Sequence, residues 1–214
     1  PLAAKGRPDR LPLSSSQERL WFLEQLSWLG ATYNIPSAYR LDGALDLSAL
    51  ERSFSALVER HEPLRTRFVQ ADGVPEQVID PAADYSLEVI DLSSLDTDAR
   101  EEEARRLMRA EAQQPFDLAR GPLFRASLLR LAEREHVVLV TMHHIVTDGW
   151  SMRGVLPREL RQLYGAFAEG RPSPLRPLEV QYADFAVWQR SWLRDEVLEN
   201  QLSYWREWLE GAPA

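Results

Sequence analysis

The sequence contains no cysteine among its 214 residues. A disulfide framework, a thiol nucleophile and a zinc site with cysteine ligands are therefore excluded. It also lacks any apolar run of about 18 residues or more, so no membrane span is predicted. Residues 1–12 are polar, contain prolines and lack the apolar segment of a signal peptide. We interpret them as an interdomain linker, and we expect the protein to be cytoplasmic.

A basic stripe is missing as well. The chain has 25 Lys and Arg against 33 Asp and Glu, which gives a formal net charge of −8, and the two signs are interleaved. Nucleic-acid binding is therefore not predicted. Hydrophobic residues make up 44% and charged residues 27% of the sequence, as in ordinary globular proteins. A chain of this length can bury a sizeable core without covalent cross-links.

Hydrophobic periodicity predicts helices alternating with strands. We expect helices near residues 14–26, 48–61, 98–113, 151–168, 182–194 and 197–210, and strands near 35–41, 64–70, 76–79, 87–90, 123–131 and 136–142. The apolar run Val137 to Val140 indicates a strand that is buried on both faces. The predicted fold class is therefore α/β, a single unit with a mixed sheet covered by helices.

Local signals refine these boundaries. The S-x-x-E spacing at Ser15 and at Ser48 predicts capping boxes for the first two helices. Asp72-Gly73 predicts a hairpin turn. Pro157 lies too deep for the first turn of a helix that starts at Ser151, so a kink or a later helix start is expected.

Only four histidines are present: His61, His136, His143 and His144. The last two are adjacent and lie at the end of the apolar strand. Side chains alternate along a strand, so His143 and His144 should point to opposite sides of the sheet. At most one of them would face a substrate, and the other should be packed. A shared metal ion is disfavoured, since zinc sites need three or four convergent ligands.

A neutral histidine can accept a proton near neutral pH. Asp148 could fix the loop after the strand, and Gly149 would let a substrate approach the backbone closely. From spacing alone, the alternative of a core histidine followed by a turn stays open. His61 lies on the apolar stripe of its helix, two residues before Pro63, so we interpret it as a core or capping histidine.

Four segments resemble, in order, the motifs of the condensation domains of nonribosomal peptide synthetases. Residues 14–23 match the first motif, with Ser16 where alanine is usual. Residues 60–68 match R-H-E-x-L-R-T-x-F in full. Residues 142–151 match M-H-H-x-x-S-D-G-W-S, with Thr147 in the serine position, and residues 182–188 match Y-x-D-F-A-V-W in full.

This resemblance implies one chloramphenicol-acetyltransferase-like lobe, the N-terminal half of a V-shaped, two-lobed domain. Residues 13–214 would form that lobe, and the C-terminal lobe would be absent. The implied reaction is acyl transfer: an acyl or peptidyl group passes from the thioester of an upstream carrier protein to the amine of a downstream aminoacyl carrier protein. Such synthetases make antibiotics and siderophores.

The implied partners are the two peptidyl carrier proteins, the missing lobe and a neighbouring adenylation domain. No cofactor or metal would be bound by this lobe, because the substrates arrive on the phosphopantetheine arms of the carrier proteins. With half of the active-site tunnel missing, the chain is expected to be inactive alone. Its exposed inter-lobe face is expected to favour self-association.

Motif positions imply the site residues. His144 would be the catalytic histidine, acting as a general base or orienting the amine, with His143 and Asp148 holding it in place. Gly149 would lie where the acceptor passes, and Trp150 would line or flank the tunnel. Because Arg65 lies on an otherwise apolar strand of the second motif, we expect it to form an ion pair with Asp148.

Four alternatives to a condensation domain exist. An epimerisation domain shares the H-H-x-x-x-D-G core, although the first two motifs here are more similar to condensation domains. A coenzyme A-dependent acyltransferase of the same superfold would not keep all four motifs, and a heterocyclisation domain carries aspartate at the positions of both histidines. A non-catalytic folding or interaction fragment is the alternative of a different class.

Overall fold

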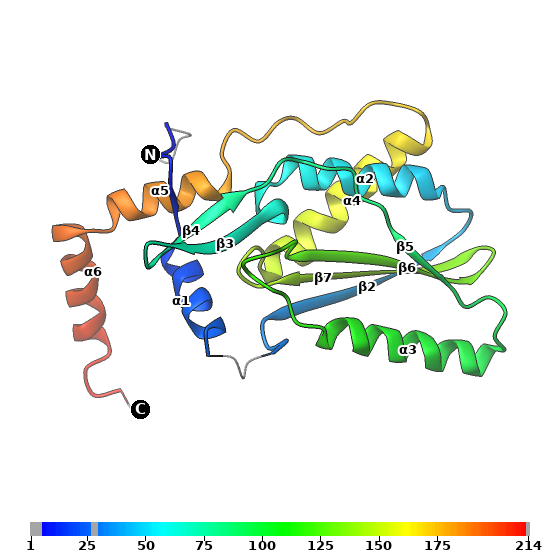
Figure 1. Ribbon diagram of the computed structural model, residues 1–214, viewed down its shortest axis with the longest axis horizontal. Coiled ribbons are helices and arrows are strands. Elements are labelled where there is room, and N and C mark those ends of the chain that lie inside the picture. The colour runs from blue at the N-terminus through cyan, green and yellow to red at the C-terminus, as the bar shows by residue number, and fades with distance from the viewer. Residues whose placement is uncertain (1–5, 27–29, 213–214) are drawn as a thin grey trace.

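A computed structural model describes residues 6–26 and 30–212, in which helices alternate with strands (Figure 1). The helices are α1 (Ser15–Glu24), α2 (Leu47–Arg60), α3 (Thr97–Gln113), α4 (Leu156–Ala168), α5 (Tyr182–Trp192) and α6 (Asp195–Trp208), with a 3₁₀ turn η1 (Glu62–Arg65) and a π-helical turn η2 (Ser151–Val155). The strands are β1 (Leu11–Pro12), β2 (Asn34–Asp42), β3 (Thr66–Ala71), β4 (Val74–Ile79), β5 (Glu88–Asp91), β6 (Phe124–Ala132) and β7 (Glu135–His143).

The strands form two sheets. The larger has the order β2-β7-β6-β5, and it is mixed, as predicted, because β5 runs parallel to β6 while the other pairs are antiparallel. The smaller antiparallel sheet, β1-β4-β3, was not predicted as a separate unit. Its β3–β4 hairpin turns at Asp72 and Gly73 as expected, with φ angles of 52° and 79°. Sequence pattern alone did not indicate which strands the hairpin would pair with.

Strand β7 carries the core of the larger sheet. Val138 and Val140 pack into the cluster that includes α2 and α4, whereas Val137 and Leu139 pack with Ala104 of α3 on the opposite face. Figure 1 shows α2 and α4 on one side of this sheet and α3 on the other. The prediction of a strand buried on both faces is therefore confirmed. The alternation also directs Met142 toward the α2–α4 side.

The predicted capping boxes are wrong by one and two residues. Helix α1 is capped by Ser14, whose Oγ accepts from the Gln17 amide while Gln17 Oε1 accepts from the Ser14 amide. Three consecutive serines allow two registers, and the burial of Ser14 and Gln17 selects this one. Helix α2 is capped by Asp46, which accepts from the Ala49 amide. Aspartate caps as well as serine does, so the S-x-x-E pattern at Ser48 was not decisive.

The chain enters α4 through the π-helical turn η2. Pro157 then stands in the first turn of α4, where its missing amide hydrogen costs nothing. The disturbance expected at Pro157 is therefore present as a π-turn in a helical stretch that already begins at residue 149, and not as a late helix start. A π-turn directly before a helix places an irregular backbone immediately after Trp150.

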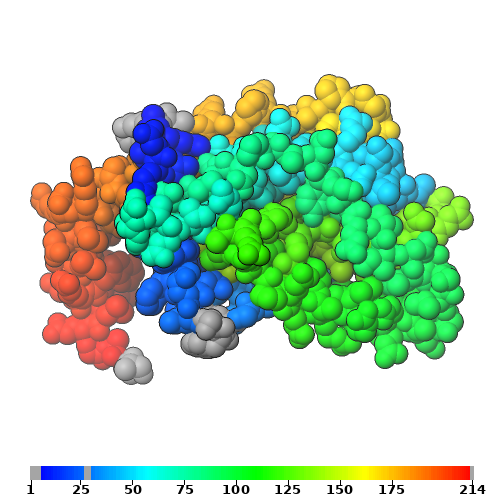
Figure 2. Space-filling view, in the orientation of Figure 1, coloured from blue at the N-terminus to red at the C-terminus, as the bar shows by residue number. Residues whose placement is uncertain are grey.

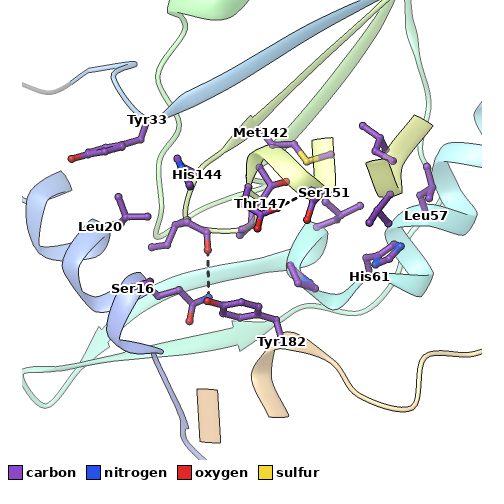
Figure 3. Close-up of a pocket in the computed structure, with 18 of the residues that line it drawn as sticks. Ser16, Leu20, Tyr33, Leu57, His61, Met142, His144, Thr147, Ser151 and Tyr182 are labelled. Atoms are coloured by element: carbon purple, nitrogen blue, oxygen red, sulfur yellow. Dashed lines mark hydrogen bonds between the residues drawn. The ribbon is translucent and has the colours of Figure 1, made fainter. Parts of the chain in front are cut away.

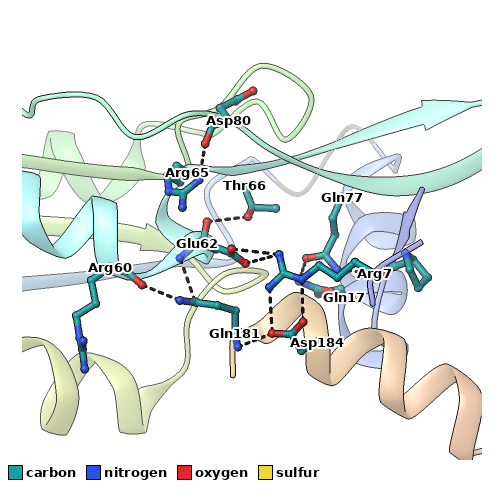
Figure 4. A network of polar contacts seen from close by, with 11 residues as sticks. Arg7, Gln17, Arg60, Glu62, Arg65, Thr66, Gln77, Asp80, Gln181 and Asp184 are labelled. Atoms are coloured by element: carbon teal, nitrogen blue, oxygen red, sulfur yellow. Dashed lines mark hydrogen bonds and ion pairs between the residues drawn. The ribbon is translucent and has the colours of Figure 1, made fainter. Parts of the chain in front are cut away.

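A polar network attaches the residues before α1 to the rest of the fold (Figure 4). Arg7 donates from Nε and Nη2 to Asp184 at 2.8 and 3.0 Å, and its Nη1 lies 2.9 Å from Glu62 Oε2. The Arg7 guanidinium holds the pKa of the buried Asp184 carboxyl below its ordinary value. With β1 pairing to β4, part of the segment interpreted as a linker is thus packed against α5 and η1.

Replacing Arg7 by methionine should lower the free energy of unfolding by about 1.5–3 kcal/mol, because a largely buried carboxylate loses its charged donor. The matched control is Arg10→Met, which removes an exposed pair with Asp72 and Glu76 and should cost less. Urea unfolding of both variants measures the difference. Equal losses would mean that the Arg7 network adds no more to stability than a surface pair.

Helix α6 lies at the edge of the molecule (Figures 1 and 2). None of its residues is buried, and its exposed side chains include Tyr204, Trp205 and Trp208. Trp208 is 71% exposed. Within the described part of the chain, no helix is long and apolar enough to cross a membrane. Residues 1–5 and 213–214, which fall in the expected linker and at the end of the expected lobe, lie outside the described residues.

Candidate functional site

A cavity of about 670 Å³ opens next to the carboxyl end of β7. Its walls come from α1, from the end of α2 with η1, from the residues after β7, and from η2 and α4 (Figure 3). This volume lies within the range of small-molecule sites. Met142 lines the cavity, which agrees with its direction toward the α2–α4 side of the sheet. The cavity therefore lies at the carboxyl end of β7, an inner strand of the larger sheet.

His144 is the first residue after β7, and its side chain lines the cavity (Figure 3). Its amide donates to the Tyr33 carbonyl at 2.8 Å, which ties the start of the loop to the residues preceding β2. The side chain is exposed. An imidazole held at its backbone but open on its ring is suited to meet a ligand.

His143 has the opposite environment. Only 2% of its surface is exposed, and its ring meets Tyr33 and Phe116 edge-on. Nδ1 accepts from the Ile145 amide at 3.1 Å, so the hydrogen is on Nε2, which donates to Glu24 at 3.2 Å. Burial lowers the pKa of His143, although Glu24 opposes the shift. The packed state predicted for one histidine of the pair is the state of His143, and the tautomer and the lowered pKa favour a neutral ring.

This environment predicts acid sensitivity. Because the pKa of His143 is lowered on folding from its ordinary value of 6.5, the unfolded chain binds a proton that the folded chain resists. The free energy of unfolding should therefore be highest above pH 6.5 and should fall as the pH drops below it. Thermal unfolding midpoints from pH 8 down to about 5 would measure this. His143→Asn, whose Oδ1 can still accept from Ile145, should flatten that part of the curve.

His136 is the matched control for this measurement, since burial also lowers its pKa. His136→Asn should remove only the part of the slope that His136 itself contributes, and should leave the part due to His143 in place. A curve that is unchanged in His143→Asn would contradict the assignment of the acid sensitivity to His143.

Asp148 closes the loop that follows the histidines. Its Oδ1 accepts from the Ser151 amide at 2.8 Å, and this hydrogen bond is the main cause of its lowered pKa. Asp148 lines the cavity, whereas Gly149 and Trp150 do not. A Cβ at Gly149 would meet the Arg153 guanidinium at 2.8 Å, so Arg153 lies directly over this glycine. Trp150 is 79% exposed.

The structure does not form the expected Arg65–Asp148 ion pair. Arg65 Nη1 donates to the Asp80 carbonyl at 2.6 Å (Figure 4). Asp148 is instead held by the backbone of its own loop. The 3₁₀ turn η1 ends at Arg65 and directs it to the β4 end, whereas the sequence had suggested that it would lie within a strand. Among the described residues, the buried Arg65 Nε has no hydrogen-bond partner.

Sequence reasoning missed one pair of cavity residues. His61, interpreted as a core or capping histidine, occupies the C-cap of α2 and also lines the cavity. Its Nε2 lies 2.6 Å from Oε2 of Glu159, a buried residue of α4. The only indication of this pair in the sequence was Glu159, a charged residue in the first turn of an amphipathic helix. In the described ranges no group of three potential metal ligands comes together.

The fold and the site together define a mixed α/β protein that presents a histidine to a ligand-sized cavity. The condensation-domain family profile matches residues 8–214, and the chain belongs to this family. It is 52% identical over 212 residues to a linear gramicidin synthase polypeptide of Brevibacillus parabrevis, covering 99% of this chain and 4% of that protein. It is 43% identical to the phosphinothricin tripeptide synthetase of Streptomyces viridochromogenes, covering 99% of this chain and 20% of the synthetase.

Solved structures agree with this assignment. The X-domain from teicoplanin biosynthesis superposes with a TM-score of 0.88 at 35% identity, covering 100% of this chain and 46% of the X-domain chain. The first condensation domain of the calcium-dependent antibiotic synthetase, in complex with a substrate analogue, gives 0.83 at 28% identity, covering 97% and 49%. The chain thus spans about half of each of these structures, and its fold corresponds to a chloramphenicol-acetyltransferase-like lobe.

Proposed function

We propose that this chain supplies the catalytic histidine for peptide-bond formation in nonribosomal peptide synthesis. The donor would be an acyl or peptidyl thioester on an upstream carrier protein, and the acceptor the amine of a downstream aminoacyl carrier protein. The observation that carries the proposal is the contrast between the two histidines. His143 is enclosed and fixed in one tautomer, whereas His144 is open to the cavity at the end of a rigid strand.

The chemistry follows from that placement. The acceptor nitrogen attacks the thioester carbonyl, a C–N bond forms, and the resulting tetrahedral species expels the thiolate as the C–S bond breaks. His144 accepts a hydrogen bond from the attacking amine, which directs its lone pair, and takes the proton that the nitrogen must lose. The same proton then goes to the departing sulfur. No group on this chain becomes acylated.

The neighbouring residues serve His144 in this scheme. His143 anchors the end of β7 to Glu24 of α1, and Asp148 fixes the following loop through the Ser151 amide. The guanidinium of Arg153 covers Gly149 on the side where a Cβ would lie, so a substrate would reach the glycine there only after this side chain is displaced. The substrates bring their own phosphopantetheine arms, so the chain would need only to bind and orient them.

An assay with two loaded carrier proteins tests the proposal, run with this chain alone and with the second lobe supplied in trans. Amide formation is expected only in the second case. Product formed by the chain alone would contradict the expected dependence on the missing lobe. No product in either case would contradict the proposed function.

A second candidate is a non-catalytic interaction module. It is favoured by the likeness to the teicoplanin X-domain, a domain also solved in complex with OxyB. Binding of a partner protein by this chain with no amide formed under any condition would support this candidate. An epimerisation activity would be recognised by inversion of a carrier-bound aminoacyl group without condensation.

Self-association stays a prediction. It was made for the exposed inter-lobe face, because large apolar patches favour association, and the exposed aromatic side chains of α6 add apolar surface to the molecule. Sedimentation velocity over a range of protein concentrations measures this. A sedimentation coefficient that does not change with concentration would contradict it.

A further inference from the structure

His61 lies on the opposite side of the cavity from His144 (Figure 3). Its backbone is fixed on both sides, since its amide donates to Leu57 at 2.9 Å and its carbonyl accepts from the Leu64 amide at 3.0 Å. The chain turns here from α2 into η1. The direction of the His61 side chain is therefore determined by the fold.

Glu159 orients the His61 ring. Its Oε2 accepts from His61 Nε2 at 2.6 Å and from Arg60 Nε at 3.1 Å. A carboxylate only accepts, so Nε2 carries a hydrogen, and in a neutral imidazole Nδ1 is then an acceptor. Arg60 is itself held, because it donates to the Arg176 carbonyl and its own carbonyl accepts from Gln181.

Burying a carboxylate is costly unless it is paired. Glu159 is only 4% exposed, and the two donors from residues 60 and 61 offset that cost. The arrangement uses Oε2 alone. Among the described residues, neither Glu159 Oε1 nor His61 Nδ1 has a hydrogen-bond partner, and neither is enclosed by protein. Of these two atoms, Nδ1 belongs to the side chain that is partly exposed at the cavity, so His61 is the one that can offer an acceptor there.

We propose that His61 is a substrate-contacting residue, whose Nδ1 accepts a hydrogen bond from an N–H or O–H group of the acyl-pantetheine substrate while the reacting end lies at His144. Glu159 is its positioning residue, because it fixes the ring and its tautomer. This inference rests on the proposed function, since it takes the ligand of the cavity to be a pantetheine thioester. It assigns the far wall of the cavity a part in substrate selection.

The donor group could come from either substrate or from the pantetheine arm, and matched probes separate these sources. N-acetylglycyl-pantetheine and N-acetylsarcosyl-pantetheine differ in one amide hydrogen of the upstream substrate. Amide-linked glycyl-pantetheine and trimethylglycyl-pantetheine keep the same charge but differ in the N–H groups of the downstream amine. Binding of each probe is followed by the imidazole ¹⁵N signals of this chain, which has only four histidines.

The expected result is that probes shift the signals of both His144 and His61. Within the pair that supplies the donor, the probe without N–H should bind about 5- to 10-fold more weakly, as for the loss of one hydrogen bond. If both members of both pairs bind equally and His61 still shifts, the donor belongs to the shared pantetheine arm. A shift at His144 without any at His61 overturns the inference alone. No shift at either histidine counts against the proposed function as well.

Two variants separate contact from scaffolding. His61→Gln places an amide near the Nε2 position, where it can still donate to Glu159, but it removes the Nδ1 acceptor. His61→Asn keeps an acceptor near Nδ1 and loses the contact with Glu159. If Nδ1 contacts substrate, Gln should weaken binding of the preferred probe by about 5- to 10-fold with an unchanged unfolding midpoint. Asn should bind more tightly than Gln despite a lower midpoint.

Glu159→Gln tests the positioning role. The glutamine Oε1 can still accept from His61 and Arg60, so most of the binding should be kept, whereas Glu159→Ala should weaken the preferred probe as His61→Gln does. If His61→Gln binds the preferred probe as tightly as the unaltered chain does, whether or not His61→Asn binds more weakly, His61 is only structural. The probe pairs compare ligands on the unaltered chain, so they test the inference even if a variant fails to fold.

Discussion

Replacing His144 by alanine should lower the rate of amide formation by about 10²- to 10⁴-fold, the usual contribution of a proton-transferring side chain. The loss follows from the proposed contact between the imidazole and the attacking amine. Because the His144 side chain is exposed, its removal should leave the unfolding midpoint unchanged. The measurement is single-turnover product formation between two loaded carrier proteins, with the second lobe present.

His143→Ala is the matched control at the neighbouring position. His143 is buried and bonded to Glu24 and Ile145, so this variant should lose stability together with activity. The roles of the two histidines are therefore distinguished by comparing the loss of rate with the loss of stability in each variant. If His144→Ala retained more than about a tenth of the rate, His144 would not be the group that moves the proton.

Phe54→Ala should cost about 3–5 kcal/mol of unfolding free energy, the loss expected when a fully buried phenylalanine is truncated. Phe54 on α2 has no exposed surface. Its ring lies 5.8 Å from that of Tyr85 and 5.9 Å from that of Phe124, measured between centroids. Removing it would leave a void between α2 and the larger sheet. The midpoint of thermal unfolding should fall by about 6–20 °C.

Phe22→Ala is the control for this experiment, since Phe22 is also helical but 59% exposed. It should change the free energy of unfolding by less than about 0.5 kcal/mol. Calorimetry of both variants gives the comparison. Similar losses at the two positions would mean that the α2 interface is not where the core of this fold lies.

The elements that sequence predicted well are those whose burial is periodic. Val137 to Val140 form a continuous apolar run, and the structure covers both faces of that strand with helices. The position of His143 and His144 at the end of this strand follows from the same pattern. Alternation along the strand also predicted that the two histidines would have different environments. The structure agrees, with His143 buried at the last position of β7 and His144 exposed directly after it.

Prediction from the sequence was less accurate where several residues could fill the same structural role. Ser14 and Ser15 both had a suitable residue three positions on, and only packing selected Ser14. The role of Arg65 was misjudged because η1 replaces the expected strand there and directs the guanidinium to Asp80. His61 and Glu159 lie 98 residues apart, and no local pattern links them. Their pairing is a consequence of α2 packing on α4.

The exposed rings of α5 and α6 give the molecule an optical property. Trp188 and Trp192 are stacked, with ring centroids 5.1 Å apart and planes 7° from parallel, so their transitions should couple and produce a paired band in the near-ultraviolet circular dichroism. Trp205 and Trp208 emit from water. Whatever covers α6 should shift this emission to shorter wavelength, so the chain carries its own spectroscopic reporter of assembly.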